Sequence, residues 1–266
     1  VDSDFRAVHH ALGADPFRLR METRMSSRFP ITAAICLAAL PANAGDMATL
    51  NILGFSDDAA VFAFEEYGVQ DGSGFPYANR FYIDTATDNF LSGSPVRARI
   101  DDESASVEDA RAQARAEGEA IVPDADLATN PGFNAGFSPP TELSADPHRI
   151  VVNPRPVQPP IDAPLEFRLE EVPFPATGTC AGIMDTSTGF RLLSVDASAG
   201  GVTEVLHEDM AVPSSRACPT GYRFGGVQTF IPFQGPSAIA VLIAVESFGF
   251  EGPDHRWMAG TRRNAQ

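Results

Sequence analysis

Three histidines, His148, His207 and His255, carry the most reactive side chains downstream of residue 44. An imidazole held beside a carboxylate can act as a general base, and His207 is followed directly by Glu208 and Asp209. None of the three stands in the H-x-H or H-E-x-x-H spacing that places two imidazoles on one zinc ion. His207 and His148 are therefore candidate bases of a hydrolase acting on glycan or peptide, but the spacing assigns no catalytic residue and no metal site.

Other enzyme classes lack their characteristic residues. All 19 basic residues are arginines, so the chain has no lysine for a phosphate-binding loop or a Schiff base. The stretch "DGSGF" at 71–75 differs from the G-x-S-x-G turn of serine hydrolases and leads into no predicted helix. Adjacent carboxylates on a strand point to opposite faces, which argues against a two-carboxylate glycosidase. A non-enzymatic role is favoured.

Calcium is the one cofactor for which the acidic turns offer ligands, because hard cations prefer several oxygen atoms. These oxygens would come from Asp57, Asp58, Glu65, Asp71 and Asp84 if residues 55–85 fold as a hairpin. The stretch lacks the alternating acidic pattern of an EF-hand loop, so the signal for calcium is weak.

Two aromatic and acidic connections are the better candidates for a binding site. Three glycines and a proline interrupt the first, at residues 66–78, and "SFGFEGPDHRW" at 247–257 forms the second. Aromatic rings with polar neighbours suit recognition of a protein, peptide or glycan partner, although the same rings could instead pack as a lid over one end of a sheet. The candidate partner-binding residues are Tyr67, Asp71, Phe75, Tyr77, Phe248 and Trp257.

The first 44 residues have the features of an upstream extension followed by a secretory signal peptide. Arg28 precedes a ten-residue apolar run at 31–40, and "ANA" at 42–44 supplies small residues for cleavage after Ala44. Ten apolar residues are too few to cross about 30 Å of hydrocarbon. We expect translation to start at Met21 or Met25 and residues 45–266 to form one exported, periplasmic or secreted domain with no membrane span after processing.

Export would leave an acidic chain with two cysteines. Removing residues 1–44 takes five of 19 arginines and four of 35 acidic residues, which leaves 14 against 31 and a formal charge of −17. Such a surface repels nucleic acid and anionic lipid. In an oxidising compartment Cys180 and Cys218 are expected to form one structural disulfide, worth roughly 4 kcal/mol.

The pattern of apolar residues predicts a mainly β fold built from antiparallel sheets. Residues 239–245 are apolar on both faces, as in an interior strand, whereas residues 165–172 alternate. One surface helix is predicted at about 105–121, capped by Ser106, and residues 123–148 have no periodicity, as in a functional or mobile loop. A hairpin is expected to turn at Gly200-Gly201.

Two resemblances bear on the architecture. "AFEEYGVQ" at 63–70 and "NRFYIDT" at 79–85 are echoed by "AVESFGFE" at 244–251 and "HRWMAGT" at 255–261, which suggests a duplicated unit. "GFSDDAAVFAFEE" with "FYIDTATD" resembles one blade of the TolB-type, WD40-like propellers, except that Ala59 replaces the usual glycine. The expected fold is therefore propeller-like or a sandwich.

Longer stretches resemble a bacterial family of predicted secreted proteins, known as domain of unknown function 2259. They are "LGFSDDAAVFAFEEYGVQDGSGFPY", "PPTEL" with "ADPHR", "VLHED" with "ACPTGYR", and "FEGPDHRW". The resemblance implies an exported protein processed near Ala44, and it carries over no catalytic or ligand-binding residues.

Overall fold

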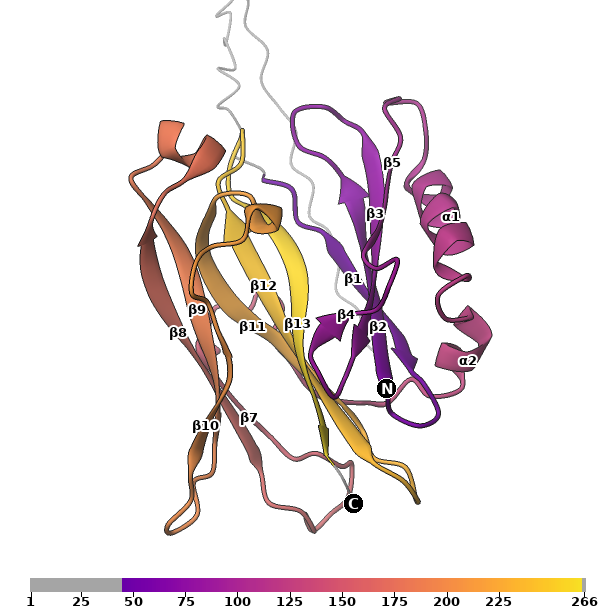
Figure 1. Ribbon diagram of the computed structural model, residues 1–266, viewed down its shortest axis with the longest axis vertical. Helices are drawn as coiled ribbons and strands as arrows, with labels where there is room; N and C mark the ends of the chain where they lie inside the picture. Colours follow the sequence, from indigo (N-terminus) through magenta and orange to yellow (C-terminus); the bar gives the residue numbers. More distant parts are fainter. Residues whose placement is uncertain (1–44, 265–266) are drawn as a thin grey trace, which may run out of the picture. The chain divides into compact units, whose positions relative to one another are not determined.

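The computed structural model describes residues 45–264, which contain three antiparallel sheets and two α-helices (Figure 1). The predicted leader, its cleavage site and the two candidate start methionines fall outside the described residues. The first sheet has the order β1 (Thr49–Phe55), β2 (Val61–Val69), β3 (Pro76–Asp84) and β4 (Asn89–Phe90), and β5 (Val96–Arg99) also pairs with β3. The central sheet has the order β13 (Asp254–Asn264), β12 (Ser237–Ser247), β11 (Pro219–Phe230) and β6 (Phe133–Phe137). The third sheet has the order β10 (Thr203–Glu208), β9 (Thr186–Val195), β8 (Leu165–Pro175) and β7 (Arg149–Val152).

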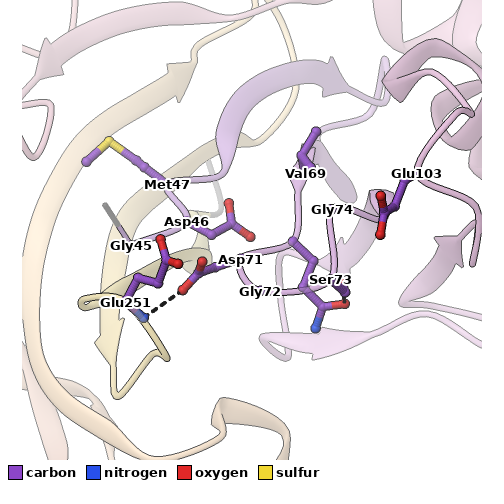
Figure 2. A pocket seen from close by; sticks show the side chains of 11 residues that line it. Gly45, Asp46, Met47, Val69, Asp71, Gly72, Ser73, Gly74, Glu103 and Glu251 are labelled. Carbon is purple, nitrogen blue, oxygen red and sulfur yellow. Dashed lines mark hydrogen bonds between the residues drawn. The ribbon is translucent and has the colours of Figure 1, made fainter. Parts of the chain in front are cut away.

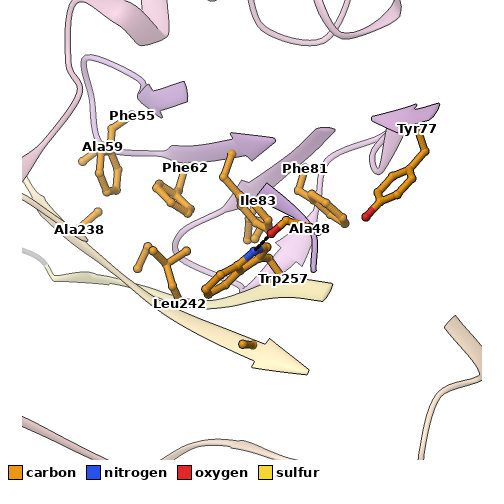
Figure 3. Packing of buried hydrophobic residues seen from close by; sticks show 13 residues of the cluster. Ala48, Phe55, Ala59, Phe62, Tyr77, Phe81, Ile83, Ala238, Leu242 and Trp257 are labelled. Carbon is orange, nitrogen blue, oxygen red and sulfur yellow. Dashed lines mark hydrogen bonds between the residues drawn. The ribbon is translucent and has the colours of Figure 1, made fainter. Parts of the chain in front are cut away.

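The central sheet is buried on both faces, as the apolar run of β12 predicts. Successive side chains of a strand point to opposite faces, so β12 presents Ala238, Ala240, Leu242 and Ala244 to the first sheet. Ile239, Val241, Ile243 and Val245 point to the third sheet, where Phe167, Phe190 and Leu192 complete a second core. The small residues on the first face leave room for the stacked rings of Phe64 and Phe81, whose centroids are 4.5 Å apart. Figure 3 shows this first core.

A helical layer covers the outer face of the first sheet. α1 (Val107–Gly118) begins at the predicted cap, where Ser106 and Asp109 form a reciprocal capping box. Ala110 and Ala114 are fully buried against the sheet, and the helix ends at Gly118, where a Cβ would lie 2.2 Å from the Tyr82 hydroxyl. The predicted surface helix is confirmed, but it spans 107–118 rather than about 105–121. A second short helix, α2 (Asp124–Ala128), and strand β6 occupy the segment predicted to be a loop.

The disulfide and the hairpins match the sequence-based expectations. Cys180, in a 3-10 turn at 178–182, is bonded to Cys218, which directly precedes β11. β9 and β10 form the hairpin predicted around Gly200-Gly201. The mainly β prediction is confirmed, and the face-to-face cores fit the sandwich alternative, whereas propeller-like repetition is not confirmed.

The two echoing stretches both fold as hairpins, β2–β3 and β12–β13, but with different registers. Ala63 is paired with Tyr82, whereas its sequence counterpart Ala244 is paired with Trp257. The alignment of the two stretches matches Trp257 with Phe81, so the registers differ by one residue. A slip of one residue exchanges the two faces of a strand. The matching side chains of β2 and β12 therefore face different cores, as Phe64 and Val245 do, whereas Phe81 and Trp257 share the first core.

Candidate functional site

The loops that end the two echoing hairpins meet at one end of the sheets, although 180 positions separate them. The loop at 70–75 places Asp71 Oδ2 at 2.9 Å from the amide nitrogen of Glu251, in the loop at 248–253, and this amide donates a hydrogen bond (Figure 2). Gly72 lies against the Phe250 ring, because a Cβ there would be 3.7 Å from Phe250 Cδ1. The positive φ of Gly72, 77°, is a backbone conformation that glycine adopts without strain. The pair of connections predicted to bind a partner thus forms one surface.

The connection between β2 and β3 is shorter than the sequence suggests. Strand pairing continues to Tyr67 opposite Ala78 and to Val69 opposite Pro76, so the irregular part is confined to residues 70–75. Because the two strands hold both ends of this short loop, its position is set by the first sheet.

Residues 45–48 form the floor beneath the two loops. They run alongside the first residues of β13: the amide of Ala48 donates to the His255 carbonyl at 3.1 Å, and the amide of His255 donates to the Asp46 carbonyl at 2.8 Å. The side chain of Asp46 accepts hydrogen bonds from Arg256 Nη2 at 2.6 Å and from the Tyr77 hydroxyl at 3.1 Å. Burial raises the pKa of the Asp46 carboxyl, and this effect outweighs the attraction of Arg256.

A hollow of about 610 Å³ lies between the loops and this floor. It is lined by Gly45, Asp46, Met47, residues 69–74, Glu103 and Glu251 (Figure 2). Glu103 and Glu251 are exposed, and among residues 45–264 neither carboxylate accepts a hydrogen bond or forms an ion pair. The hollow is therefore acidic, with unneutralised charge at its rim.

The predicted aromatic residues divide into two groups. Tyr77 and Trp257 are each only 6% exposed, and the Trp257 indole donates to the Ala48 carbonyl at 2.8 Å. Tyr67 is half-buried, with the guanidinium of Arg111 4.1 Å from its ring centroid. Tyr77 and Trp257 thus pack against residues 46–48 beneath the loops, and Tyr67 packs toward α1, as the packing interpretation expected for part of the set.

The exposed aromatic surface comes from the second loop. Phe248 is 55% exposed and Phe250 is 85% exposed, whereas Phe75 is half-buried, with the guanidinium of Arg99 5.9 Å from its ring centroid. The sequence-based set omitted Phe250, although Gly249 precedes it and Glu251 and Gly252 follow it in the quoted stretch. A phenylalanine in so polar a turn has little apolar material nearby to cover it, and that is the signal that could have identified it.

Two carboxylates, Glu66 of β2 and the half-buried Asp88 of the β3–β4 turn, hold β13 and with it the second loop. Glu66, 2% exposed, accepts hydrogen bonds from the Trp257 amide at 2.6 Å and from Asn79 Nδ2 at 2.8 Å. Asp88 accepts from the amide of Thr261 at 2.6 Å and from its hydroxyl. Burial raises the pKa of both carboxyl groups, and the backbone hydrogen bonds oppose the shift. β13 is an edge strand of the central sheet, and its outward amides could otherwise pair with another chain. At Trp257 and Thr261 these amides donate instead to the two carboxylates.

The disulfide region holds the start of the second loop. The Cys218 carbonyl accepts a hydrogen bond from the Phe248 amide at 2.9 Å, and the Arg216 carbonyl accepts one from the Ser247 hydroxyl at 3.2 Å. The disulfide-bonded Cys218 is therefore hydrogen-bonded directly to Phe248, an exposed residue of the candidate surface.

The two histidines proposed as bases each have one ring nitrogen within hydrogen-bond distance of an acceptor oxygen. His207 Nε2 lies 2.9 Å from Asp209 Oδ1, and its ring stacks on Phe190 with centroids 4.8 Å apart. His148 Nε2 lies 3.0 Å from the carbonyl oxygen of Tyr222. Within residues 45–264, no hydrogen bond joins a histidine ring to a serine, threonine or cysteine side chain. The structure thus shows a His–Asp pair with no hydroxyl or thiol hydrogen-bonded to its imidazole among the described residues.

The five carboxylates considered for calcium form no common cluster: the exposed Asp57 shares its turn with Asp58, beside Asp84, whereas Glu65 lies within β2 and Asp71 beyond its far end. Asp58 and Asp84 accept hydrogen bonds from residues of their own turns, and Glu65 accepts from Arg111 Nη2 at 2.8 Å. Asp71 lies at the opposite end of β2, in the hollow. No cluster of three or more potential metal ligands occurs among the described residues. The expectation from the sequence, no cofactor and only a weak signal for calcium, stays a prediction.

Comparison with known proteins identifies a family. A family model described as "Predicted secreted protein (DUF2259)" matches residues 63–263. No curated protein and no solved structure matches the chain. None of the helices in residues 45–264 has the length and apolar content that a membrane span requires.

Proposed function

Because the chain belongs to this family of predicted secreted proteins, we propose that it acts after export to the periplasm, once the leader has been cleaved after Ala44, as a non-enzymatic binding module. The partner, a protein, peptide or glycan of the cell envelope, binds the surface formed by the two loops. This loop surface consists of Met47, Val69, Asp71, Phe75, Glu103, Phe248, Phe250 and Glu251.

The observation that carries the proposal is the joining of the two loops around exposed aromatic rings. The hydrogen bond from the Glu251 amide to Asp71 fixes one loop against the other, so Phe250 is displayed on a defined backbone. Rigid aromatic anchors lose little conformational entropy on binding and contribute most of the energy at many protein interfaces. Phe250 is 85% exposed in the free protein, and burying it against a partner would remove a large apolar area from water.

The double substitution Phe248→Ser/Phe250→Ser tests this function. The purified mature protein, carrying a photo-crosslinker near residue 250, is incubated with a periplasmic extract, and cross-linked partners are quantified by mass spectrometry. The matched control is Phe233→Ser, since Phe233 is 97% exposed in the turn between β11 and β12, away from the loop surface. We expect the double variant to lose at least about nine-tenths of the captured partner, as two interface hot spots should. The control should retain it.

Stability measurements complete this test. Substitution of exposed side chains usually changes the free energy of unfolding by no more than about 0.5 kcal/mol, so both variants should melt close to the wild type. Tyr77 and Trp257 do not suit the test, because their rings are buried. Truncating either ring would leave a cavity and destabilise the packing that holds the loops in place. Equal capture by wild type and the double variant would refute the proposed binding function.

A hydrolase remains a second candidate, favoured by the His207–Asp209 pair. A carboxylate 2.9 Å from Nε2 could orient this imidazole as a base, with Nδ1 left for a substrate or water. His148 is the other candidate base. Turnover of a glycan and peptide panel by the wild type, abolished by His207→Ala or His148→Ala, would establish this function. A binding module would turn over none of these substrates.

A further inference from the structure

The geometry points to a particular chemistry of partner: we infer that the loop surface binds a polypeptide segment in which cationic side chains alternate with apolar ones. This inference rests on the proposed binding function and specifies its ligand. Three features of the loop surface support this inference: its apolar side chains, the charges around them and the size of the hollow.

The apolar part of the loop surface comes from three separate segments. Phe250 and Phe248 are 85% and 55% exposed, Val69 is 49% exposed, and Met47 is 44% exposed. Val69 belongs to the first sheet, the phenylalanines follow β12, and Met47 lies in the floor segment, so the fold gathers them rather than the local sequence. Exposed apolar side chains of this kind mark a site that binds other apolar groups. A partner must therefore present apolar side chains to this surface, and a small hydrated anion has none to present.

The charge beside these apolar side chains is negative. Glu103 and Glu251 line the hollow with no cation paired to either among the described residues, and Asp71 binds only the Glu251 amide. Two arginines of this region are paired with other carboxylates: Arg256 offsets the charge of Asp46, which also lines the hollow, at 2.6 Å, and Arg99 pairs with Asp101 at 2.7 Å. A cationic ligand gains attraction here, whereas an anionic one is repelled by this surface and by a mature chain of formal charge −17.

Arginine and lysine side chains match this juxtaposition of acid and apolar groups. Their methylene stems pack on apolar surface while the charged ends reach carboxylates. A guanidinium can also lie over an exposed aromatic face, as Arg111 does over Tyr67 in this protein at 4.1 Å. A hollow of about 610 Å³ has room for more than one such side chain. A neutral glycan would use the rings but not the unpaired carboxylates, so a basic polypeptide is the better fit.

The test uses a defined probe, a fluorescein-labelled nine-residue peptide in which three arginines alternate with leucines. A second peptide carries glutamine in place of each arginine, and a third carries glycine in place of each leucine. Binding is measured by fluorescence anisotropy at about 0.05 M and 0.3 M salt, where screening differs strongly. We expect the first peptide to bind at least about tenfold more tightly than either of the others, with the difference from the glutamine peptide shrinking at high salt.

Matched variants distinguish binding at the loop surface from a nonspecific attraction of the peptide to the negative net charge of the protein. Glu103→Gln/Glu251→Gln removes two charges from the hollow, and Glu117→Gln/Asp126→Asn removes two exposed charges from the helical layer. We expect the first variant to weaken peptide binding about tenfold and the second less than twofold. Equal effects of the two variants would mean that the peptide responds only to net charge, which would overturn the inference.

The outcome also distinguishes this inference from the function on which it rests. If none of the peptides binds, but capture from the periplasmic extract still depends on Phe248 and Phe250, the binding function stands and the partner chemistry proposed here is wrong. If capture is independent of both phenylalanines, the binding function itself fails. A glycan array bound by the wild type and not by Phe248→Ser/Phe250→Ser would likewise overturn the basic polypeptide in favour of a sugar.

Discussion

Asp209 is a buried carboxylate on which three hydrogen-bond donors converge. Its replacement should destabilise the protein and increase local opening next to the loop surface. The residue follows β10 and is 7% exposed. It accepts hydrogen bonds from the Phe190 amide at 2.9 Å, from His207 Nε2 at 2.9 Å and from Arg216 Nη1 at 2.5 Å. The carbonyl of Arg216 in turn accepts the Ser247 hydroxyl, next to the exposed Phe248.

Replacing Asp209 with Asn keeps the shape of the side chain but leaves a guanidinium without its counter-charge. The side chain of Arg216 is 12% exposed, and removing one partner of such a buried pair costs about 3–5 kcal/mol. Arg216 keeps a hydrogen bond to the Tyr222 hydroxyl at 3.3 Å and a place over the Phe190 ring, with its guanidinium 4.9 Å from the ring centroid. These contacts place the expected loss at the lower end, about 3 kcal/mol.

The same variant should change the response to acid. Burial alone would raise the pKa of Asp209, but the hydrogen bonds from His207, Arg216 and the Phe190 amide outweigh it and lower the pKa from 3.8 to about 2. As the pH falls, the unfolded chain takes up this proton first, so the stabilising contribution is complete above about pH 4 and is lost toward about pH 2. It amounts to roughly 2 kcal/mol. Asp209→Asn should therefore lose stability less steeply between these two pH values than the wild type.

Urea unfolding at pH 7 and across the acid range measures both effects. The fluorescence of Trp257, the one tryptophan of the chain, reports the transition because its ring is 6% exposed in the folded state. Glu208→Gln is the matched control: its side chain is 41% exposed and pairs with Arg191, and exposed pairs contribute less than about 1 kcal/mol. Amide exchange at Phe248 should also accelerate in Asp209→Asn. Equal destabilisation by Asp209→Asn and Glu208→Gln, or an unchanged acid limb in the former, would refute the reasoning.

Three further predictions concern the disulfide, one close packing contact and metal binding. Replacing Cys180 and Cys218 by serine should lower stability by roughly 4 kcal/mol in a urea titration, and a loss below about 1 kcal/mol would show that the cross-link does not restrain the unfolded chain. Gly225→Ala places a Cβ 2.0 Å from Trp257 Cζ3 and should cost about 1–3 kcal/mol by overpacking, whereas Gly182→Ala, with nothing within 4 Å, should leave thermal unfolding nearly unchanged; similar melting of the two would contradict the packing argument. Calcium and chelator should give the same melting temperature, since the described carboxylates form no cluster of three or more ligands, and a calcium-dependent rise would restore the metal hypothesis.

Local patterns in the sequence predicted much of the fold. A period of two residues marked the strands, and a glycine pair marked the turn between β9 and β10. Ser106 with Asp109 marked the start of α1, because a capping box needs residues three apart and nothing from elsewhere in the chain. The disulfide was predictable because only two cysteines follow residue 44. Each of these features depends on neighbours in the sequence or on a count.

The candidate site depended on contacts that the sequence does not encode locally. Tyr77 and Phe250 occur in similar aromatic and glycine-bearing stretches, yet one is 6% exposed and the other 85%. The difference arises because residues 45–48 and β13 cover Tyr77, whereas Phe250 has Gly72 beside its ring and is otherwise open to solvent. The repeat visible in the sequence did not reveal this, since it aligns Phe250 with Val69 rather than with Tyr77. The one-residue shift in register also places matching residues of β2 and β12, such as Phe64 and Val245, in different cores. Periodicity states which side chains of a strand share a face. Packing between segments as far as 209 residues apart decides which face of a strand meets another sheet and which loop stays open to solvent.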